Sequence, residues 1–272
     1  MMPKSNPILC GSISSRPSPF GVVMHNAAYR ALDVPFTYVA FGTENTREAV
    51  LAMRYLGIRG LGVSMPHKIE IMQYLDAIDE TAAKIGAVNT VVNDDGHLTG
   101  YNTDWIGAMR AIQEKVDIAG KRSVVVGAGG AARAIVYGLI KEQSQVTIYN
   151  KTVNKGEKLA RDFDVQFGGG LAELGSVKDY DILVNATSVG FHAPDESVVP
   201  PAILRESKVV LDVVFIPPES KLVQDARSRG SVAISGIRML VHQARYQFEL
   251  YTGKHAPFEV MEKALLERIR RL

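Results

Sequence analysis

The clearest pattern of apolar and polar positions along the chain lies in residues 121–152. Three valines after Ser123 predict a buried strand, and a segment of small residues starting at Gly127 separates it from an apolar helix that reaches about Glu142. The apolar positions of residues 145–149 predict a second short strand. Strand, glycine turn, helix and strand in this order are typical of a dinucleotide-binding βαβ unit.

The residues before this unit carry a second set of alternating strand and helix patterns. More than a hundred residues precede Gly127, and their alternation predicts another α/β domain. Strands are expected at residues 7–13, 36–41, 60–65, 88–93 and 97–101, the last two as a hairpin across Asp94, Asp95 and Gly96. Helices are expected at residues 20–32, 46–56, 66–75, 81–85 and 103–115.

The alternation continues beyond Thr152 and stops at Gly236. A helix to Phe163, a loop at residues 168–170, strands at 181–187, 208–214 and 232–235, and a helix at 220–229 are expected. Two helices without a strand then follow, one ending near Gly253 and one at residues 258–272. Since these helices do not extend the sheet, we expect them to pack on the first domain.

An α/β fold with two domains is therefore predicted. Residues 1–105 and 237–272 form the expected substrate-binding and catalytic domain, and residues 106–236 form the expected Rossmann-type domain that binds the cofactor. A length of 272 residues agrees with two hydrophobic cores rather than one. A cleft between two such domains is a usual place for cofactor and substrate to meet.

Composition narrows the function classes. The chain is 46% hydrophobic and 22% charged with a net charge of +2, which gives no reason to expect a nucleic-acid or membrane partner. Cys10 is the single cysteine, so an intrachain disulfide is excluded and a reducing cytoplasm is expected. No apolar run of membrane-spanning length and no signal-peptide core is seen. The six histidines lack paired spacing, so no metal site is expected.

The glycine turn predicts how a pyrophosphate would be held. Gly127 allows the tight turn after the strand, and Gly129 lets the backbone approach the phosphates. The helix that follows presents unpaired N–H groups and a positive dipole end. The predicted cofactor-binding residues of this turn are Gly127, Ala128, Gly129, Gly130 and Ala131.

The end of the second strand indicates which dinucleotide is preferred. A site for NAD usually has Asp or Glu here to hold the ribose 2′-hydroxyl, whereas this chain has Asn150 followed by Lys151 and Lys155. An amide and two ammonium groups attract a 2′-phosphate that a carboxylate would repel, so NADP is predicted. The alternative is that both lysines belong to an ordinary solvated helix start.

Polar residues near predicted strand ends of the first domain are candidates for chemistry. An enzyme that oxidises a secondary alcohol needs a proton acceptor beside the hydroxyl and groups that orient the substrate. Lys68 is expected on the first turn of a helix, Asn89 at a strand start, and Asn102 and Asp104 at a strand-to-helix turn. If these turns line one rim, Lys68 and Asp104 would share a substrate hydroxyl. Alternatively, Lys68 is a surface lysine and Asp104 a helix N-cap.

A set of motifs in this order resembles shikimate dehydrogenases. They span residues 10–250 and comprise residues 18–20, 63–68, 87–90, 101–104, 127–131, 150–152, 185–188 and 236–243. The resemblance implies NADP-linked interconversion of shikimate and 3-dehydroshikimate in a two-domain cytoplasmic protein.

The resemblance also implies roles for individual residues. Lys68 and Asp104 would be the catalytic pair, Asn89, Asp104 and Gln243 would hold substrate hydroxyls, and Ser18 would hold the substrate carboxylate. Arg16 and Ser64 join the predicted substrate-binding residues. Cofactor contacts are further expected from Asn150, Lys151, Thr152, Lys155, Asn185, Thr187 and Gly236.

Several positions depart from the family pattern. Arg16 replaces a serine, Gly62 an asparagine and Phe215 a tyrosine, all in the substrate pocket, and Lys151 replaces an arginine. This pattern resembles the divergent shikimate-dehydrogenase-like branch. Weak activity on shikimate is predicted, with a related cyclic hydroxy acid such as quinate as the alternative substrate. The rival hypothesis is a regulatory or binding protein with little turnover. Both a monomer and a homodimer agree with the sequence.

Overall fold

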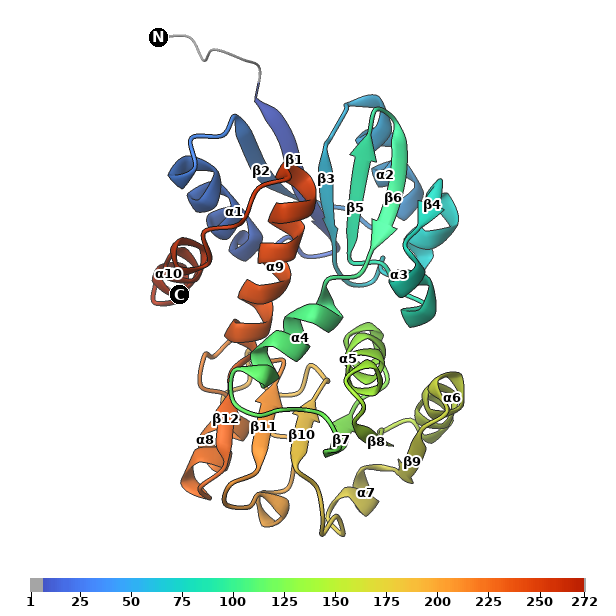
Figure 1. The fold of residues 1–272 in the computed structure, drawn as a ribbon, viewed down its shortest axis with the longest axis vertical. Coiled ribbons are helices and arrows are strands. Elements are labelled where there is room, and N and C mark those ends of the chain that lie inside the picture. Colours follow the sequence, from blue (N-terminus) through green and yellow to red (C-terminus); the bar gives the residue numbers. More distant parts are fainter. Residues whose placement is uncertain (1–6, 272) are drawn as a thin grey trace. The chain divides into compact units, whose positions relative to one another are not determined.

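The computed structural model describes residues 7–271, which divide into two compact units. Of these residues, unit 1 comprises 7–103 and 243–271, and unit 2 comprises Asp104–His242. The boundaries predicted from the sequence, at residues 105 and 237, differ from these by a few residues. The second boundary differs more because one continuous helix, α9 (Gly236–Thr252), runs through it. The predicted α/β fold class is confirmed (Figure 1).

Unit 1 contains a mixed six-stranded sheet in the order β2-β1-β3-β5-β6-β4. Strands β2, β1 and β3 are parallel, whereas β5 is antiparallel to both of its neighbours. The strands are β1 (Ile8–Ser14), β2 (Phe36–Gly42), β3 (Gly60–Val63), β4 (Ala77–Ile78), β5 (Thr90–Asp94) and β6 (His97–Tyr101). The predicted hairpin is present, with Asp95 and Gly96 at positive φ in its turn. The two-residue strand β4 is too short for a sequence pattern.

Helices cover both faces of this sheet. On one face, Leu61 and Val63 of β3 belong to an apolar cluster with residues of α2 (Thr46–Tyr55), the 3₁₀ helix η1 (Glu70–Tyr74) and α3 (Glu80–Ile85). Helices α1 (Pro19–Ala31) and α10 (Phe258–Ile269) pack side by side (Figure 1). Helix α1 begins where Ser18 caps it and Pro19 fixes the first turn.

An aromatic layer covers the other face of β3. The ring of Tyr251 lies over Gly60, where a Cβ atom would be 2.2 Å from that ring. His25 of α1 is fully buried and stacks on Tyr38 of β2, with 4.3 Å between the ring centroids. Burial lowers the pKa of the His25 imidazole to about 3 and raises the pKa of the Cys10 thiol to about 12. Both groups are therefore neutral at pH 7.

Unit 2 is a doubly wound parallel sheet in the order β12-β11-β10-β7-β8-β9. The chain starts in the middle at β7, adds strands on one side and then crosses to β10, so the order reverses between β7 and β10. The strands are β7 (Arg122–Val126), β8 (Gln145–Tyr149), β9 (Gln166–Gly169), β10 (Ile182–Asn185), β11 (Val209–Asp212) and β12 (Val232–Ile234). The order is that of a Rossmann fold.

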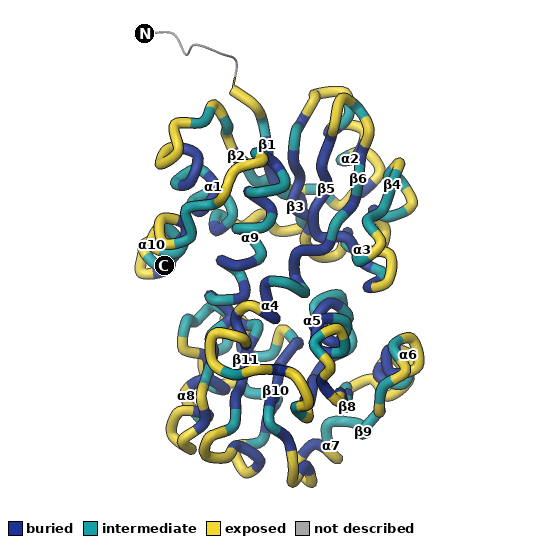
Figure 2. The backbone as a smooth tube through the Cα atoms, in the orientation of Figure 1, coloured by how far each residue is buried: buried dark blue, intermediate teal, exposed yellow. Residues whose placement is uncertain are grey.

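Two apolar clusters lie on opposite faces of this sheet. One includes residues of α4 (Asp104–Gln113), α5 (Gly130–Lys141), α6 (Val153–Phe163) and the start of α9. The other includes residues of α7 (Leu171–Leu174), the 3₁₀ helix η2 (Pro201–Ile203) and α8 (Lys221–Ser228). Figure 2 shows the central strands between them as mostly buried, whereas α6 and α8 contain several exposed positions. The expectation of a loop at residues 168–170 was wrong, because β9 includes Gly168, where a Cβ atom would clash with the Tyr149 ring at 2.3 Å.

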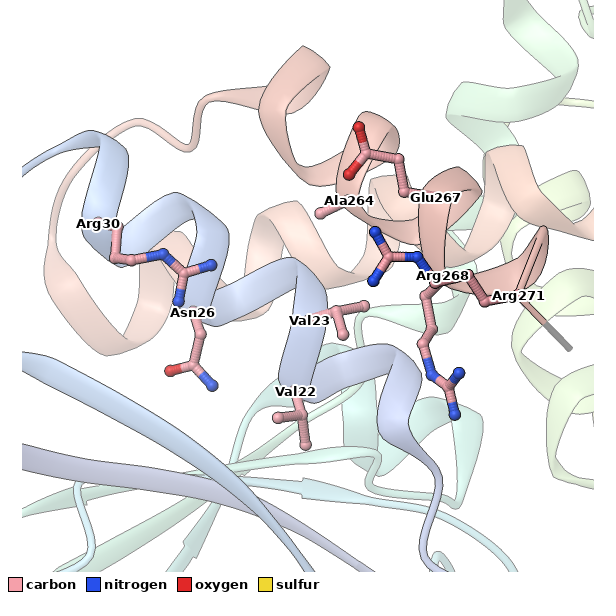
Figure 3. A pocket seen from close by; sticks show the side chains of 8 residues that line it. All are labelled: Val22, Val23, Asn26, Arg30, Ala264, Glu267, Arg268 and Arg271. Atoms are coloured by element: carbon pink, nitrogen blue, oxygen red, sulfur yellow. The ribbon is translucent and has the colours of Figure 1, made fainter.

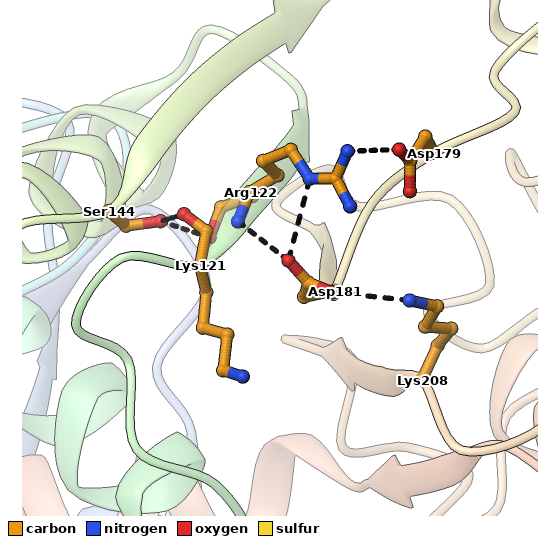
Figure 4. A network of polar contacts seen from close by, with 7 residues as sticks. Lys121, Arg122, Ser144, Asp179, Asp181 and Lys208 are labelled. Atoms are coloured by element: carbon orange, nitrogen blue, oxygen red, sulfur yellow. Dashed lines mark hydrogen bonds and ion pairs between the residues drawn. The ribbon is translucent and has the colours of Figure 1, made fainter.

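The amino ends of the strands in unit 2 are joined by ion pairs (Figure 4). Asp181, just before β10, accepts from the Arg122 backbone N–H at 3.0 Å and pairs with the Lys208 ammonium at 3.1 Å. Arg122 also pairs with Asp179. The hydrogen bond from Arg122 is the main cause that lowers the pKa of the Asp181 carboxyl. This edge is therefore held by charged side chains that are used within the protein.

Candidate active site

The register of unit 1 brings several predicted site segments to one edge of its sheet. Ser12 of β1 pairs with Gly62 of β3, Gly62 pairs with Thr90 of β5, and Thr90 pairs with Tyr101 of β6. Because β5 runs antiparallel, its first residue lies where the other three strands end. The segments that leave this edge contain Ser18, Ser64, Lys68, Asn89 and Thr103.

Backbone hydrogen bonds fix these segments to one another. The Ser64 N–H donates to the Ile13 carbonyl at 3.0 Å, and the Val88 N–H donates to the Lys68 carbonyl at 2.8 Å. The structure thus ties the backbone of Lys68 to the residue before Asn89. Lys68 is half-buried and lies in a turn before η1, so its expected place on a helix was wrong. Its carbonyl bonds to Val88 instead of to a residue one helical turn later.

His67 holds this turn from inside. Its imidazole is fully buried, with Nδ1 at 2.8 Å from the Thr46 hydroxyl and Nε2 at 3.0 Å from the Thr43 carbonyl oxygen. Both ring nitrogens are therefore used by the protein. His67 is therefore a buried packing residue that holds the turn in place.

Asn89 is the centre of a buried amide and hydroxyl network. Its Oδ1 accepts from the Thr103 backbone N–H at 2.7 Å and from the Thr90 hydroxyl at 2.8 Å. Its Nδ2 donates to the Thr103 hydroxyl and to Gln243 Oε1, both at 3.0 Å. Two of the predicted substrate ligands, Asn89 and Gln243, are thus in direct contact. The amide of Asn89 cannot turn over without losing the bond to the backbone N–H.

Gln247 was not singled out by sequence analysis, yet it joins this network. It lies one helical turn after Gln243 on α9 and is buried. Its Nε2 donates to the Thr90 hydroxyl at 3.0 Å and to the Asn89 carbonyl at 3.3 Å. The four-residue spacing of two glutamines was the available sequence signal, because it puts both amides on one side of a helix.

Arg16 and Ser18 lie on the segment after β1, and both are exposed. The Ser18 hydroxyl oxygen accepts from the Phe20 N–H at 3.3 Å as the N-cap of α1. Its hydrogen remains able to donate to an anion. Within residues 7–271, no carboxylate forms an ion pair with Arg16. Their roles as carboxylate ligands stay predictions.

Asp104 is the first residue of α4 and is buried. It follows Thr103 directly, and Thr103 is held by Asn89 through both its N–H and its hydroxyl. Asp104 belongs to unit 2 and Lys68 to unit 1. The predicted catalytic pairing of these two residues stays a prediction.

The glycine turn of unit 2 lies between β7 and α5, at the point where the strand order reverses. Gly127 has φ of +125°, and a Cβ atom there would lie 3.0 Å from the Ala186 carbonyl oxygen. Gly129 differs, because a Cβ atom on it would meet no atom within 4 Å. No side chain caps the start of α5. Open space beside uncapped N–H groups is what a pyrophosphate requires, so these residues fit the cofactor.

The end of β8 lies next to this turn. The Gly127 N–H donates to the Tyr149 carbonyl at 2.8 Å, and Asn150 follows Tyr149. The Asn150 side chain donates to the Thr152 carbonyl at 2.8 Å, which holds the start of α6. Lys151 and Lys155 are exposed, and within residues 7–271 neither forms an ion pair. Their ammonium groups are available to a phosphate.

The end of β10 supplies a second polar cluster. Asn185 donates to Asp212 Oδ1 at 2.9 Å and accepts from the Thr187 hydroxyl at 2.7 Å. Burial raises the pKa of the Asp212 carboxyl to about 6, although hydrogen bonds from Ser220 and others oppose this rise. Sequence analysis missed Asp212, whose partner Asn185 is 27 positions away in the chain, and Ser220, which donates to Asp212. Asn185 and Thr187 are oriented by the protein rather than free to rotate.

Gly236 begins α9 where two backbone segments come close. A Cβ atom there would lie 2.4 Å from the Val213 carbonyl oxygen. Packing alone therefore requires glycine at this position. A contact from Gly236 to the cofactor stays a prediction.

A groove on unit 1 is lined by none of these residues. It has a volume of about 320 Å³ and is lined by Val22, Val23, Asn26 and Arg30 of α1 and by Ala264, Glu267, Arg268 and Arg271 near the end of α10. Figure 3 shows the guanidinium groups of Arg30 and Arg268 pointing toward one another from the two helices. Arg30 and Arg268 occupy last turns of helices, where a cation interacts favourably with the helix dipole. The groove contains no predicted site residue.

No helix in residues 7–271 is both long and apolar enough to cross a membrane. In the same residues, no three His, Cys, Asp or Glu side chains are grouped so that they would hold a metal ion.

The chain matches three family profiles along its length. Residues 12–91 match the shikimate dehydrogenase substrate binding domain, residues 110–214 match shikimate / quinate 5-dehydrogenase, and residues 236–266 match the shikimate 5'-dehydrogenase C-terminal domain. The first profile covers the segments of Ser18, Lys68 and Asn89. The second covers the glycine turn.

Similar proteins cover nearly the whole chain. The shikimate dehydrogenase (NADP(+)) of Methanothermobacter thermautotrophicus is 41% identical over 92% of this chain and 92% of its own length. A shikimate dehydrogenase crystal structure in complex with NADP+ is 37% identical, covers 98% of this chain and 99% of that one, and has a TM-score of 0.90. The quinate dehydrogenase of Corynebacterium glutamicum in complex with NAD is 30% identical, covers 97% of this chain and 100% of that one, and has a TM-score of 0.89. This chain therefore belongs to the shikimate dehydrogenase family.

Proposed function

We propose that this protein is an NADP-dependent dehydrogenase that reversibly oxidises a CH–OH group of shikimate or of a related cyclic hydroxy acid such as quinate. The observation that carries this proposal is the edge of the unit 1 sheet. There the backbone of Lys68 is bonded to Val88, and the next residue, Asn89, is bonded to Gln243. A cation and two amides suit a substrate with several hydroxyl groups.

The proposed residues divide the work of binding and proton transfer. Ser18 would hold the carboxylate of the substrate. Arg16, on the same segment, and Ser64, directly after β3, would assist it. Asn89 and Gln243 would orient its hydroxyls. Lys68 and Asp104 would take the proton of the reacting hydroxyl, with Lys68 either as the base or as the cation that stabilises the alkoxide.

NADP, when bound, supplies the nicotinamide that accepts the hydride of the alcohol. The turn from Gly127 to Ala131 would hold its pyrophosphate at the start of α5. Lys151 and Lys155 would attract the 2′-phosphate, and Thr152 would lie beside them. Asn185, Thr187 and Gly236 complete the proposed cofactor contacts.

The identity of the substrate depends on three positions of the proposed pocket, Arg16, Gly62 and Phe215, which differ from the family pattern. Gly62 offers no side chain, and Phe215 contacts Phe191 with 5.4 Å between ring centroids, so neither donates a hydrogen bond from its side chain. A lost hydrogen bond to a bound ligand costs about 1 kcal/mol. Weaker activity on shikimate than that of efficient biosynthetic enzymes, and placement in the divergent branch, follow as proposals.

A substrate panel tests this function. Shikimate, quinate and other cyclic hydroxy acids would each be offered with NADP or NAD, and reduced nicotinamide would be followed by absorbance. Turnover with NADP on at least one acid is expected. Measurable NADP binding without turnover on any acid would favour a regulatory protein instead. We further propose a cytoplasmic monomer or homodimer, which light scattering and fractionation would check.

A further inference from the structure

The amides at the edge of the unit 1 sheet form a chain with a fixed direction. The Asn89 carbonyl can only accept, so the hydrogen bond from Gln247 fixes which end of the Gln247 side chain faces it. The same Nε2 donates to the Thr90 hydroxyl at 3.0 Å. The Thr90 hydroxyl has one hydrogen, which then goes to Asn89 Oδ1 at 2.8 Å.

The direction continues from Asn89 to Gln243. Asn89 Oδ1 also accepts from the backbone N–H of Thr103, a group that can only donate. Its Nδ2 must therefore face Gln243, whose Oε1 accepts at 3.0 Å. Its oxygen is used in this way and, among residues 7–271, its Nε2 has no protein acceptor, so the Nε2 hydrogens are left for a ligand.

Gly62 makes room for this chain. A Cβ atom at Gly62 would lie 2.8 Å from the Tyr38 hydroxyl and 3.5 Å from Gln247 Nε2. The volume that a larger side chain would occupy on β3 is thus filled by the phenol of β2 and the amide of α9.

We propose that Gln247 is a positioning residue that acts through Thr90 and Asn89 to make Gln243 a hydrogen-bond donor toward an acceptor oxygen of the substrate. The proposal rests on the function given above, because Gln243 must face the hydroxy acid. It specifies that the group opposite Gln243 is a hydroxyl lone pair, a carboxylate oxygen or a ketone oxygen.

Removal of the donor tests the positioning role. Gln247→Met keeps the length of the side chain but has no N–H, so KM for the hydroxy acid is expected to rise about fivefold to tenfold. The value of kcat should stay within about threefold and KM for NADP should not change, since this interaction orients the substrate in ground state and transition state alike. Gln224→Met, on α8 of unit 2, is the matched control.

A double-mutant cycle tests the route through Thr90. Thr90→Val removes the hydroxyl at constant shape and should give a similar rise in KM, while Thr90→Ser should restore nearly wild-type KM. If both residues act through one hydroxyl, Gln247→Met should add less than twofold to the effect of Thr90→Val. Independent, multiplying effects would overturn the route.

Gln243→Glu tests the polarity itself. It keeps an oxygen that accepts from Asn89 but replaces the donor with a second oxygen, which repels an acceptor. KM should rise about fiftyfold or more, against about tenfold for Gln243→Met. Equal KM values for Gln243→Glu and the wild type would contradict a donor role.

These outcomes separate the positioning role from the function on which it rests. If the wild type turns over no acid of the panel, the proposed function fails and this inference fails with it. If the wild type is active but Gln247→Met lowers only the melting temperature and leaves KM unchanged, the residue is merely structural and the proposed function stands.

Discussion

The proposed substrate site in unit 1 and the proposed cofactor site in unit 2 differ in the groups that they offer to a ligand. At the edge of the unit 1 sheet, the amide of Asn89 is held by backbone and side-chain partners on both of its ends. At the turn after β7 in unit 2, Gly129 leaves open space and no side chain caps the helix. A small polyol acid is recognised by side chains held in one orientation, whereas a pyrophosphate is recognised by bare backbone N–H groups.

The largest effect is expected from the side-chain edge. Lys68→Met should lower kcat roughly a thousandfold, because it removes the group proposed to accept the proton or to stabilise the alkoxide. NADP affinity, measured by fluorescence titration, should not change, since Lys68 belongs to unit 1. Lys263→Met on α10 serves as the control and should leave kcat unaltered. A Lys68→Met enzyme with normal kcat and only a raised KM would remove Lys68 from the chemistry.

In the glycine turn after β7, substitutions of Gly127 and Gly129 should have different effects. Gly129→Ala should weaken NADP binding by roughly tenfold to a hundredfold, because the methyl group enters the open space, while the free energy of unfolding should barely change. Gly127→Ala should instead lower that free energy by about 1–3 kcal/mol, since its φ is +125° and its Cβ would crowd Ala186. Calorimetric binding and urea unfolding measure both. Equal destabilisation by the two substitutions would show that Gly129 is not kept for a ligand.

A smaller effect should distinguish the two dinucleotides. Lys151→Ala is expected to raise KM for NADP about tenfold and to leave KM for NAD nearly unchanged, because only NADP carries the 2′-phosphate. Steady-state kinetics with each cofactor measures this ratio, and Lys178→Ala in the same unit is the control. Parallel losses for both cofactors would mean that Lys151 contacts some other part of the dinucleotide.

The smallest effect concerns the aromatic layer beneath the substrate edge. The folded-state pKa of His25 lies at about 3, below its ordinary value of 6.5, so the unfolded chain takes up the proton first as pH falls. Stability from this residue is thus complete above pH 6.5 and is lost toward pH 3. Lowering the pH from 7 to 5.5 should therefore reduce the free energy of unfolding by about 1 kcal/mol.

His25→Phe separates this effect from other titrations. The carboxyl of Asp212 has the opposite sign, because its pKa is raised to about 6 and its protonation stabilises the folded state as pH falls below that value. Denaturant unfolding of wild type and His25→Phe at several pH values gives the difference. A pH dependence that the substitution does not change would assign the loss to groups other than His25.

The sequence predicts more of the proposed cofactor site in unit 2 than of the proposed substrate site in unit 1, and the reason is physical. The glycine turn, its helix and the two lysines lie within a few dozen residues, so local pattern contains most of their arrangement. The hydrogen bond between Asn89 and Gln243 joins residues 154 positions apart, and no periodic pattern in the sequence predicts it. Family resemblance placed both in one site, but only the structure adds Gln247 and the direction of the amide chain.

Errors of the sequence analysis also have local causes. Lys68 was expected on a helix because Pro66 suits a first turn, yet its carbonyl bonds to Val88 from a distant strand. Strand β9 was taken for a loop because of its glycines, whereas Gly168 is small so that the strand can pack against Tyr149. In both places, a long-range contact overrides the preference of the segment.

The buried thiol of Cys10 can serve as a probe of local opening in unit 1. This thiol is the only one in the chain, it is fully buried in β1, and its raised pKa keeps it unreactive while the surrounding layer is closed. The rate at which a thiol reagent labels Cys10 therefore reports local unfolding of unit 1 and does not depend on local unfolding of unit 2. Slower labelling in the presence of a hydroxy acid, without any cofactor, would reveal ligand binding even where catalysis is too slow to follow.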